Sequence, residues 1–146
     1  MWTEIEGNLW TIPAERMKAG VTHRIPLSNR CLEILEEVKQ ISNGSEYIFF
    51  GTKKDRPLSE NTFSKLIAEL GYGVHVHGFR TSFRTWTQEK THYQREVAEA
   101  ALAHSLKDKA EAAYARSDLL DKRREMMETW SHYISDKKTE VIAIRG

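Results

Sequence analysis

Apolar residues at helical spacing dominate the second half of the chain, and this pattern constrains the fold most. Residues 77–89, 95–104, 107–116 and 118–134 each read as one helix. In the last of these segments, five side chains fall along one stripe: Leu120, Arg123, Met127, Trp130 and Ile134. This stripe predicts that the last helix packs against the others. Three aromatic residues at helical spacing, Phe79, Phe83 and Trp86, predict that the first helix is buried as well.

The first half of the chain begins with extended segments. Residues 9–12 and 22–27 are joined by a polar connection that contains Gly20, which predicts a β-hairpin with its tip at residues 17–20. Ser28 is predicted to cap a helix that ends before the sequence SNGS. The order of a small antiparallel sheet near residues 9–27 followed by a helical bundle predicts an α+β fold that is mostly α.

Two further elements are predicted between the hairpin and the helical half. The sequence EYIFFG reads as a short strand or a buried extended piece. Ser59 is predicted to cap a second helix, and four of its apolar residues are expected to face inward: Phe63, Leu66, Ile67 and Leu70. This helix is expected to end near Gly71.

Composition limits the class of protein. The 146 residues are 40% hydrophobic and 29% charged, which is typical of one globular domain. We expect an intracellular, cytoplasmic protein without a membrane partner, because the sequence shows no apolar run long enough for a membrane span and no signal-peptide pattern. The single cysteine, Cys31, argues against an internal disulfide and a cysteine-based zinc site. The net charge of +1 neither supports nor excludes a polyanionic partner.

Five polar residues make a set that suits a phosphodiester. Arg80 offers a planar, bidentate donor, and His77 and His104 add hydrogen-bond donors, so together they fit a phosphate better than a carbonyl. Tyr114 supplies a phenol that becomes nucleophilic when a neighbouring base such as His77 accepts its proton. Lys18, at the predicted hairpin tip, can protonate a leaving oxygen. Lys53 and Lys54 compete with Lys18 for this role.

A metal site is the main alternative for the histidines. His75 and His77 form an H-x-H pair, with His92 or His104 as a conceivable third ligand. We predict no metal site, because no Asp, Glu or Cys stands at ligand spacing near this pair.

Four fragments of the sequence carry a family resemblance: WTIPAERMKAGVTHRIPLS, HGFR, LAHS and AYARSDLLDKRREMMETWSHYI. They resemble the catalytic domain of tyrosine recombinases, specifically phage and prophage integrases of the satellite-phage type, over residues 1–134. The resemblance implies the fold of DNA breaking-rejoining enzymes. It also implies that Tyr114 attacks DNA to form a 3′-phosphotyrosyl link, that Arg80, His77 and His104 hold the scissile phosphate, and that Lys18 protonates the leaving group. No cofactor is expected, since the chemistry implied needs neither ATP nor a metal.

The resemblance also implies partners and an arrangement of domains. Duplex DNA at attachment sites is the expected substrate, bound by a homo-oligomer, a tetramer, with accessory DNA-bending proteins as further partners. The protein is expected to be encoded by a bacterium or a phage and to associate with the nucleoid. Four basic residues are expected to contact DNA: Arg116, Arg84, Lys53 and Lys54. Residues 1–135 are predicted to form a partial catalytic domain. Residues 136–146 are predicted to form a tail that docks as a strand in cis or in trans, because Val141, Ile142 and Ile144 make a short apolar run.

One departure from the family pattern leaves two alternatives open. These integrases carry another phosphate-binding arginine just before the segment with which this sequence starts, so we expect a truncated domain with impaired strand exchange. The first alternative is a DNA-binding remnant that does not cut. The second is a type IB topoisomerase, which shares the chemistry, although the sequence resembles the integrases more in WTIPAERMK and in LLDKRREMMETW.

Overall fold

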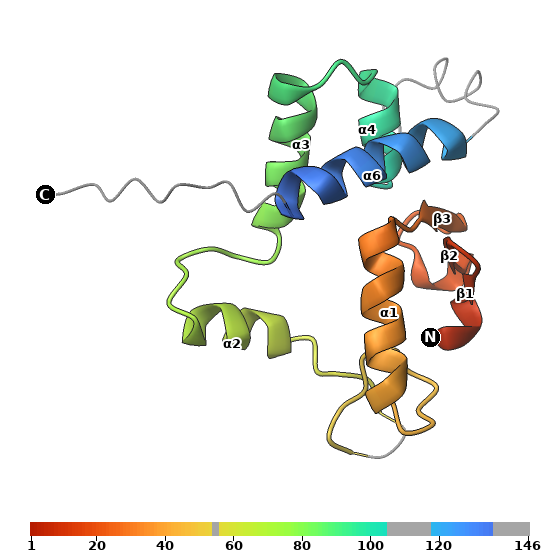
Figure 1. The fold of residues 1–146 in the computed structure, drawn as a ribbon, viewed down its shortest axis with the longest axis vertical. Coiled ribbons are helices and arrows are strands. Elements are labelled where there is room, and N and C mark those ends of the chain that lie inside the picture. Colours follow the sequence, from red (N-terminus) through yellow and green to blue (C-terminus); the bar gives the residue numbers. More distant parts are fainter. Residues whose placement is uncertain (54–55, 105–117, 136–146) are drawn as a thin grey trace, which may run out of the picture.

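The computed structural model describes residues 1–53, 56–104 and 118–135 (Figure 1). A small sheet comes first in the chain and helices follow, so the predicted α+β, mostly α class is confirmed. Figure 1 shows the sheet beside helix α1, and helices α3, α4 and α6 gathered in a separate group. Within the described ranges, no helix has the length and apolar character that crossing a membrane requires.

Three short antiparallel strands form the sheet, in the order β1-β2-β3. A 3-10 helix, η1 (Trp2–Glu4), precedes β1 (Ile5–Glu6), β2 (Leu9–Ile12) and β3 (His23–Pro26). The predicted hairpin is confirmed, because β2 and β3 pair directly with Trp10 opposite Ile25. A second 3-10 helix, η2 (Ala14–Arg16), and a turn lie between them. In that turn the Gly20 amide donates to the Met17 carbonyl at 2.9 Å, with Gly20 at φ +63°, a conformation that glycine adopts at little cost.

Helix α1 (Asn29–Ile41) begins where the sequence predicts. The Ser28 hydroxyl accepts a hydrogen bond from the Cys31 amide at 3.4 Å, which satisfies one of the free donors of the first turn. The Asn29 backbone amide donates to Glu128 at 3.0 Å and the Asn29 side chain donates to the same carboxylate at 3.3 Å. These two bonds attach the start of α1 to α6, so the first half of the chain is held against the helical half.

The core lies between helices α3 (Gly78–Lys90), α4 (Arg95–Ala101) and α6 (Leu120–Ser135). Its buried members are Phe83, Trp86, Val97, Ala98, Leu102 and Met126. Trp130 covers this cluster, with its ring centroid 5.0 Å from that of Trp86 and 5.5 Å from that of Phe83, the latter edge to face. Such aromatic packing contributes beyond the area that it buries. Three of the four predicted helices are thereby confirmed, and the fourth, 107–116, lies outside the described residues.

Helix α2 (Thr62–Glu69) exists as predicted, but its expected inward face was wrong. Phe63, Leu66 and Leu70 are 46%, 47% and 61% exposed. Figure 1 shows the reason, because α2 stands apart from the other helices. The cap was also wrong: Asn61 holds the N-cap position, and Ser59 instead accepts the Asn61 amide through its hydroxyl at 3.4 Å.

Two other expectations about apolar residues need correction. The sequence EYIFFG does not form a strand, since only Phe50 makes an isolated bridge, with Pro57, and half of Phe49 is exposed. Phe79 and Ile134 are 57% and 61% exposed, although both were expected in buried stripes. Phe79 lies in the first turn of α3 and Ile134 in the last turn of α6, so both stripes are buried only over the middle of their helices.

Arg123 is buried in the contact between α6 and β3. Arg123 is only 1% exposed, as its place in the predicted stripe implied. Its guanidinium donates to the Arg24 carbonyl at 2.5 Å and to the Asp118 carbonyl at 3.2 Å. Burial lowers the pKa of Arg123, while the nearby Asp118 carboxylate acts in the opposite sense. The Asp118 carboxylate also accepts from Arg24 at 2.8 Å, which strengthens the same contact.

Candidate functional site

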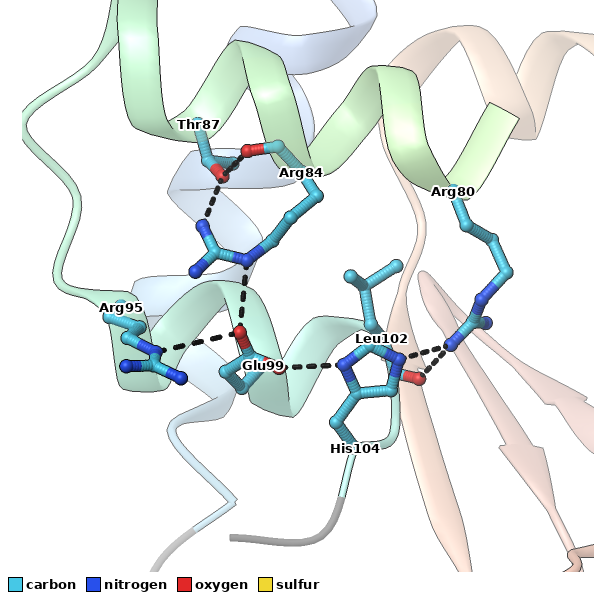
Figure 2. Close-up of polar contacts among 7 residues, drawn as sticks. All are labelled: Arg80, Arg84, Thr87, Arg95, Glu99, Leu102 and His104. Carbon is cyan, nitrogen blue, oxygen red and sulfur yellow. Dashed lines mark hydrogen bonds and ion pairs between the residues drawn. The ribbon is translucent and has the colours of Figure 1, made fainter. Parts of the chain in front are cut away.

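Arg80 and His104 meet where the first turn of α3 approaches the end of α4. The Arg80 Nη2 atom donates to the Leu102 carbonyl at 2.6 Å and lies 3.0 Å from His104 Nε2 (Figure 2). Both residues remain exposed to solvent. A guanidinium and an imidazole that share one exposed position can together receive an anion, so the structure brings together two of the five predicted catalytic residues.

The end of α4 determines where His104 lies. The His104 amide donates to the Glu99 carbonyl at 3.0 Å, and the Ala103 amide donates to the Ala100 carbonyl at 3.2 Å. Ala103 has a left-handed backbone at φ +53°. These features make a Schellman motif, which reverses the chain direction directly after a helix. His104 is therefore placed by a defined turn that returns its ring toward Glu99 on the preceding helix.

Glu99 is the acceptor at the centre of this cluster. Its Oε2 atom lies 2.6 Å from His104 Nδ1, and its Oε1 atom accepts from Arg84 Nε at 2.9 Å (Figure 2). Arg95 approaches Oε1 at 3.8 Å. Burial raises the pKa of Glu99, but the His104 hydrogen bond and the Arg84 charge outweigh it, so the pKa lies below its usual range. Glu99 is thus an ionised carboxylate that links two helices at neutral pH.

Among the described residues, the side chains of His77 and Lys18 make no hydrogen bond or ion pair with this cluster. His77 occupies the N-cap position of α3 without a side-chain capping bond, and its carbonyl accepts from the Arg80 amide at 3.2 Å. Lys18 is exposed in the turn between η2 and β3, close to the predicted hairpin tip. Tyr114 lies outside the described residues, so its role stays a prediction.

Of the four residues predicted to contact DNA, the structure describes Arg84 and Lys53. Arg84 is bound to Glu99, and its Nη1 atom lies 3.5 Å from the Thr87 hydroxyl. Its guanidinium therefore makes contacts within the protein. Lys53 is exposed. Arg116 and Lys54 lie outside the described residues. Contact with DNA stays a prediction for all four.

Two residues at the site were missed from the sequence. Glu99 stands four residues after Arg95 and five before His104, a spacing that places it on the helical turn below the histidine. His23, on β3, is half-buried near the Ala101 carbonyl. Burial and the Arg123 charge lower the pKa of His23, while the Ala101 carbonyl acts in the opposite sense, so its imidazole is neutral at physiological pH. Neither residue belongs to a recognisable motif, and only their proximity to the cluster reveals them.

The metal-binding side chains of the described residues are not gathered into a cluster that could hold an ion. Over residues 1–53, 56–104 and 118–135, no three His, Cys, Asp or Glu side chains lie close enough to hold an ion together.

Comparison with known proteins places this chain in a family. The model of the phage integrase family matches residues 2–120. The chain is 39% identical over 138 residues to the prophage integrase IntA of Escherichia coli (strain K12), which covers 91% of this chain and 33% of IntA. It is 32% identical over 163 residues to the integrase of Enterobacteria phage P4, covering 98% of this chain and 37% of that protein. It is 33% identical over 138 residues to the integrase of Shigella phage Sf6, which covers 92% of this chain and 36% of that protein.

The chain therefore belongs to the phage integrase family. The resemblance to tyrosine recombinases of phages and prophages is confirmed. The chain spans 33% to 37% of the length of these curated relatives. No solved structure matches the fold significantly.

Proposed function

We propose that this chain takes part in site-specific DNA recombination, in which strands are cut and rejoined through a 3′-phosphotyrosyl intermediate on Tyr114. The observation that supports this most is the cluster at the end of α4, where Arg80 and His104 share one exposed position at 3.0 Å. A planar guanidinium beside an imidazole suits the non-bridging oxygens of a phosphate, which gain charge as the phosphorus is attacked.

The chemical steps assign one role to each residue. The Tyr114 oxygen attacks the phosphorus after its proton passes to His77, and a new oxygen–phosphorus bond forms. The bond between phosphorus and the 5′ oxygen breaks, and Lys18 gives that oxygen a proton. Arg80 and His104 hold the phosphate throughout. Because the phosphotyrosyl link conserves the energy of the phosphodiester, the reverse sequence with a new 5′ hydroxyl rejoins the strand without ATP.

The proposed substrate is duplex DNA at attachment sites, bound largely through its phosphates and therefore more weakly as salt increases. We further propose that a homo-oligomer, a tetramer, acts on this DNA, with accessory DNA-bending proteins as partners. Residues 136–146 would dock in cis or on a neighbouring subunit. Deletion after Asp136 tests the tail: assembly on DNA should weaken, and unchanged assembly would refute the docking role.

The covalent intermediate provides the test of function. The product of the longest open reading frame that contains this chain is incubated with nicked duplexes from the prophage ends and run on a denaturing gel. We expect a shifted protein–DNA band with the unchanged protein and none with Tyr114→Phe. Tyr72→Phe is the matched control, since Tyr72 is 64% exposed on the segment before α3, and it should leave the band unchanged.

We propose DNA binding without cleavage as the alternative function. The isolated 146 residues would then bind DNA without cutting it. When the same experiment is run with the isolated 146 residues, DNA binding without a shifted band would support this binding role. Relaxation of a plasmid without site preference would instead favour the type IB topoisomerase chemistry.

A further inference from the structure

We propose that Glu99 is a positioning residue that holds the His104 imidazole in one tautomer and one orientation. The proposal rests on the proposed function, in which Arg80 and His104 receive a phosphate. Figure 2 shows the contacts that carry it, with Glu99 and Arg80 at opposite nitrogens of the same ring.

The two contacts of the ring select the same tautomer. A guanidinium has donors only, so at 3.0 Å from Arg80 Nη2 the His104 Nε2 atom must accept a hydrogen bond. A neutral imidazole with an accepting Nε2 carries its proton on Nδ1. That nitrogen lies 2.6 Å from Glu99 Oε2, and an ionised carboxylate can only accept. Both ends of the ring therefore require the Nδ1–H form.

Burial and a second partner hold the Glu99 carboxylate in position to accept from His104. Its side chain is only 16% exposed, and Arg84 occupies the other carboxylate oxygen at 2.9 Å. Arg84 also balances the negative charge of Glu99, so the charge of Arg80 remains available for an anion. A carboxylate without this partner would weaken phosphate binding by repulsion.

The consequence for the reaction is geometric. With Nδ1–H bound to Glu99, Nε2 is the nitrogen that faces Arg80 and any phosphate bound beside it. When the ring takes a proton from solvent, Nε2–H becomes a donor to a phosphate oxygen while Nδ1–H stays on Glu99. Glu99 itself touches neither the phosphate nor Tyr114, and it acts only through His104.

Nitrogen-15 NMR of the histidine-labelled 146-residue chain tests this directly, because a protonated and an unprotonated ring nitrogen have well separated shifts. The chain has six histidines, and the loss of one signal in His104→Gln identifies the ring. Within the neutral form of the ring, we expect His104 as Nδ1–H with about a tenfold preference or more, given the strength of a charge-assisted bond. A ring protonated on Nε2 in the unchanged protein would overturn the proposal, and this measurement needs no variant.

Two substitutions on α4 add a matched comparison. Glu99→Gln keeps the size of the side chain, but its amide can donate to Nδ1, so the preference for Nδ1–H should fall about tenfold or reverse. Glu96→Gln, exposed on the same helix, should leave the His104 signals unchanged. An unchanged tautomer in Glu99→Gln, with far-ultraviolet circular dichroism showing a folded chain, would refute the role of Glu99.

Inorganic phosphate separates this proposal from the proposed function. Added phosphate should shift the His104 Nε2 signal in the unchanged chain and in Glu96→Gln, and it should need about tenfold higher concentration in Glu99→Gln. An Nδ1–H tautomer with no response to phosphate would support Glu99 as the residue that fixes the tautomer of His104. The same result would count against the phosphate site itself. A response of equal strength in all three proteins would refute the positioning role.

Discussion

The left-handed alanine at the end of α4 provides a sharp test of how His104 is placed. Ala103 has φ +53°, and an L-residue in this region costs roughly 1–2 kcal/mol that glycine does not incur. Glycine also makes the unfolded chain more flexible, and this offsets about 0.4–1 kcal/mol of that gain in stability. Ala103→Gly should therefore raise the free energy of unfolding by about 0.5–1 kcal/mol, and the melting temperature by roughly 2–4 °C for a chain of this size.

Ala100→Gly is the matched control, one turn earlier in the same helix. Ala100 lies within α4, where glycine costs about 0.5–1 kcal/mol relative to alanine, so this variant should be less stable than the unchanged protein. Urea unfolding followed by circular dichroism measures both. If Ala103→Gly lost as much stability as Ala100→Gly, residue 103 would be helical, and the Schellman turn that places His104 would be wrong.

Two further predictions concern buried ionic groups. Arg123→Met should destabilise the protein by about 3 kcal/mol in urea unfolding, since two backbone carbonyls would lose their buried hydrogen-bond donor. Lys122 makes only an exposed hydrogen bond to Gln94, so Lys122→Ala should change the free energy of unfolding by less than about 0.5 kcal/mol. An equal loss of stability in the two variants would mean that Arg123 lies at the surface. Burial raises the pKa of Glu4, but hydrogen bonds, the largest from the Trp10 indole, outweigh it and lower the pKa to about 2. The stabilisation by Glu4 is therefore complete above its ordinary pKa of 4.5 and is lost as the pH falls toward about 2. The difference in unfolding free energy between the unchanged protein and Glu4→Gln should narrow over that interval, and a difference independent of pH would contradict the lowered pKa.

Patterns of apolar and polar residues predicted the helices and strands well where the two faces of an element differ in polarity. The β2–β3 hairpin follows from two extended runs around a turn with Gly20, and α1 follows from the Ser28 cap. The buried section of α3 follows from Phe83 and Trp86, which repeat at helical spacing. These features are local, so a single sequence contains them.

The pattern could not identify what each face contacts. The apolar stripe of α2 was read as buried because Phe63 and Leu66 share a face, yet both remain about half exposed. A stripe shows that a helix has an apolar side, but burial depends on a neighbour that the pattern does not name.

The candidate site was predicted in part. Arg80 and His104 were identified by chemistry and by the family resemblance, and the structure brings them together. Glu99 was not identified, because a glutamate in a helix is usually a solvated charge. Its role depends on the turn at Ala103, which returns His104 to it, and on Arg84 from another helix.

The most direct test of the central claim asks whether Arg80 neutralises the charge of the scissile phosphate. Covalent complex formation is compared for the unchanged protein and Arg80→Ala on nicked duplexes that carry either a normal phosphate or a neutral methylphosphonate at the cleavage position. We expect Arg80→Ala to lose about 100-fold or more in rate on the phosphate and to recover most of that loss on the neutral linkage. An equal loss on both duplexes would mean that Arg80 serves the fold through the Leu102 carbonyl rather than the phosphate, and it would contradict the account.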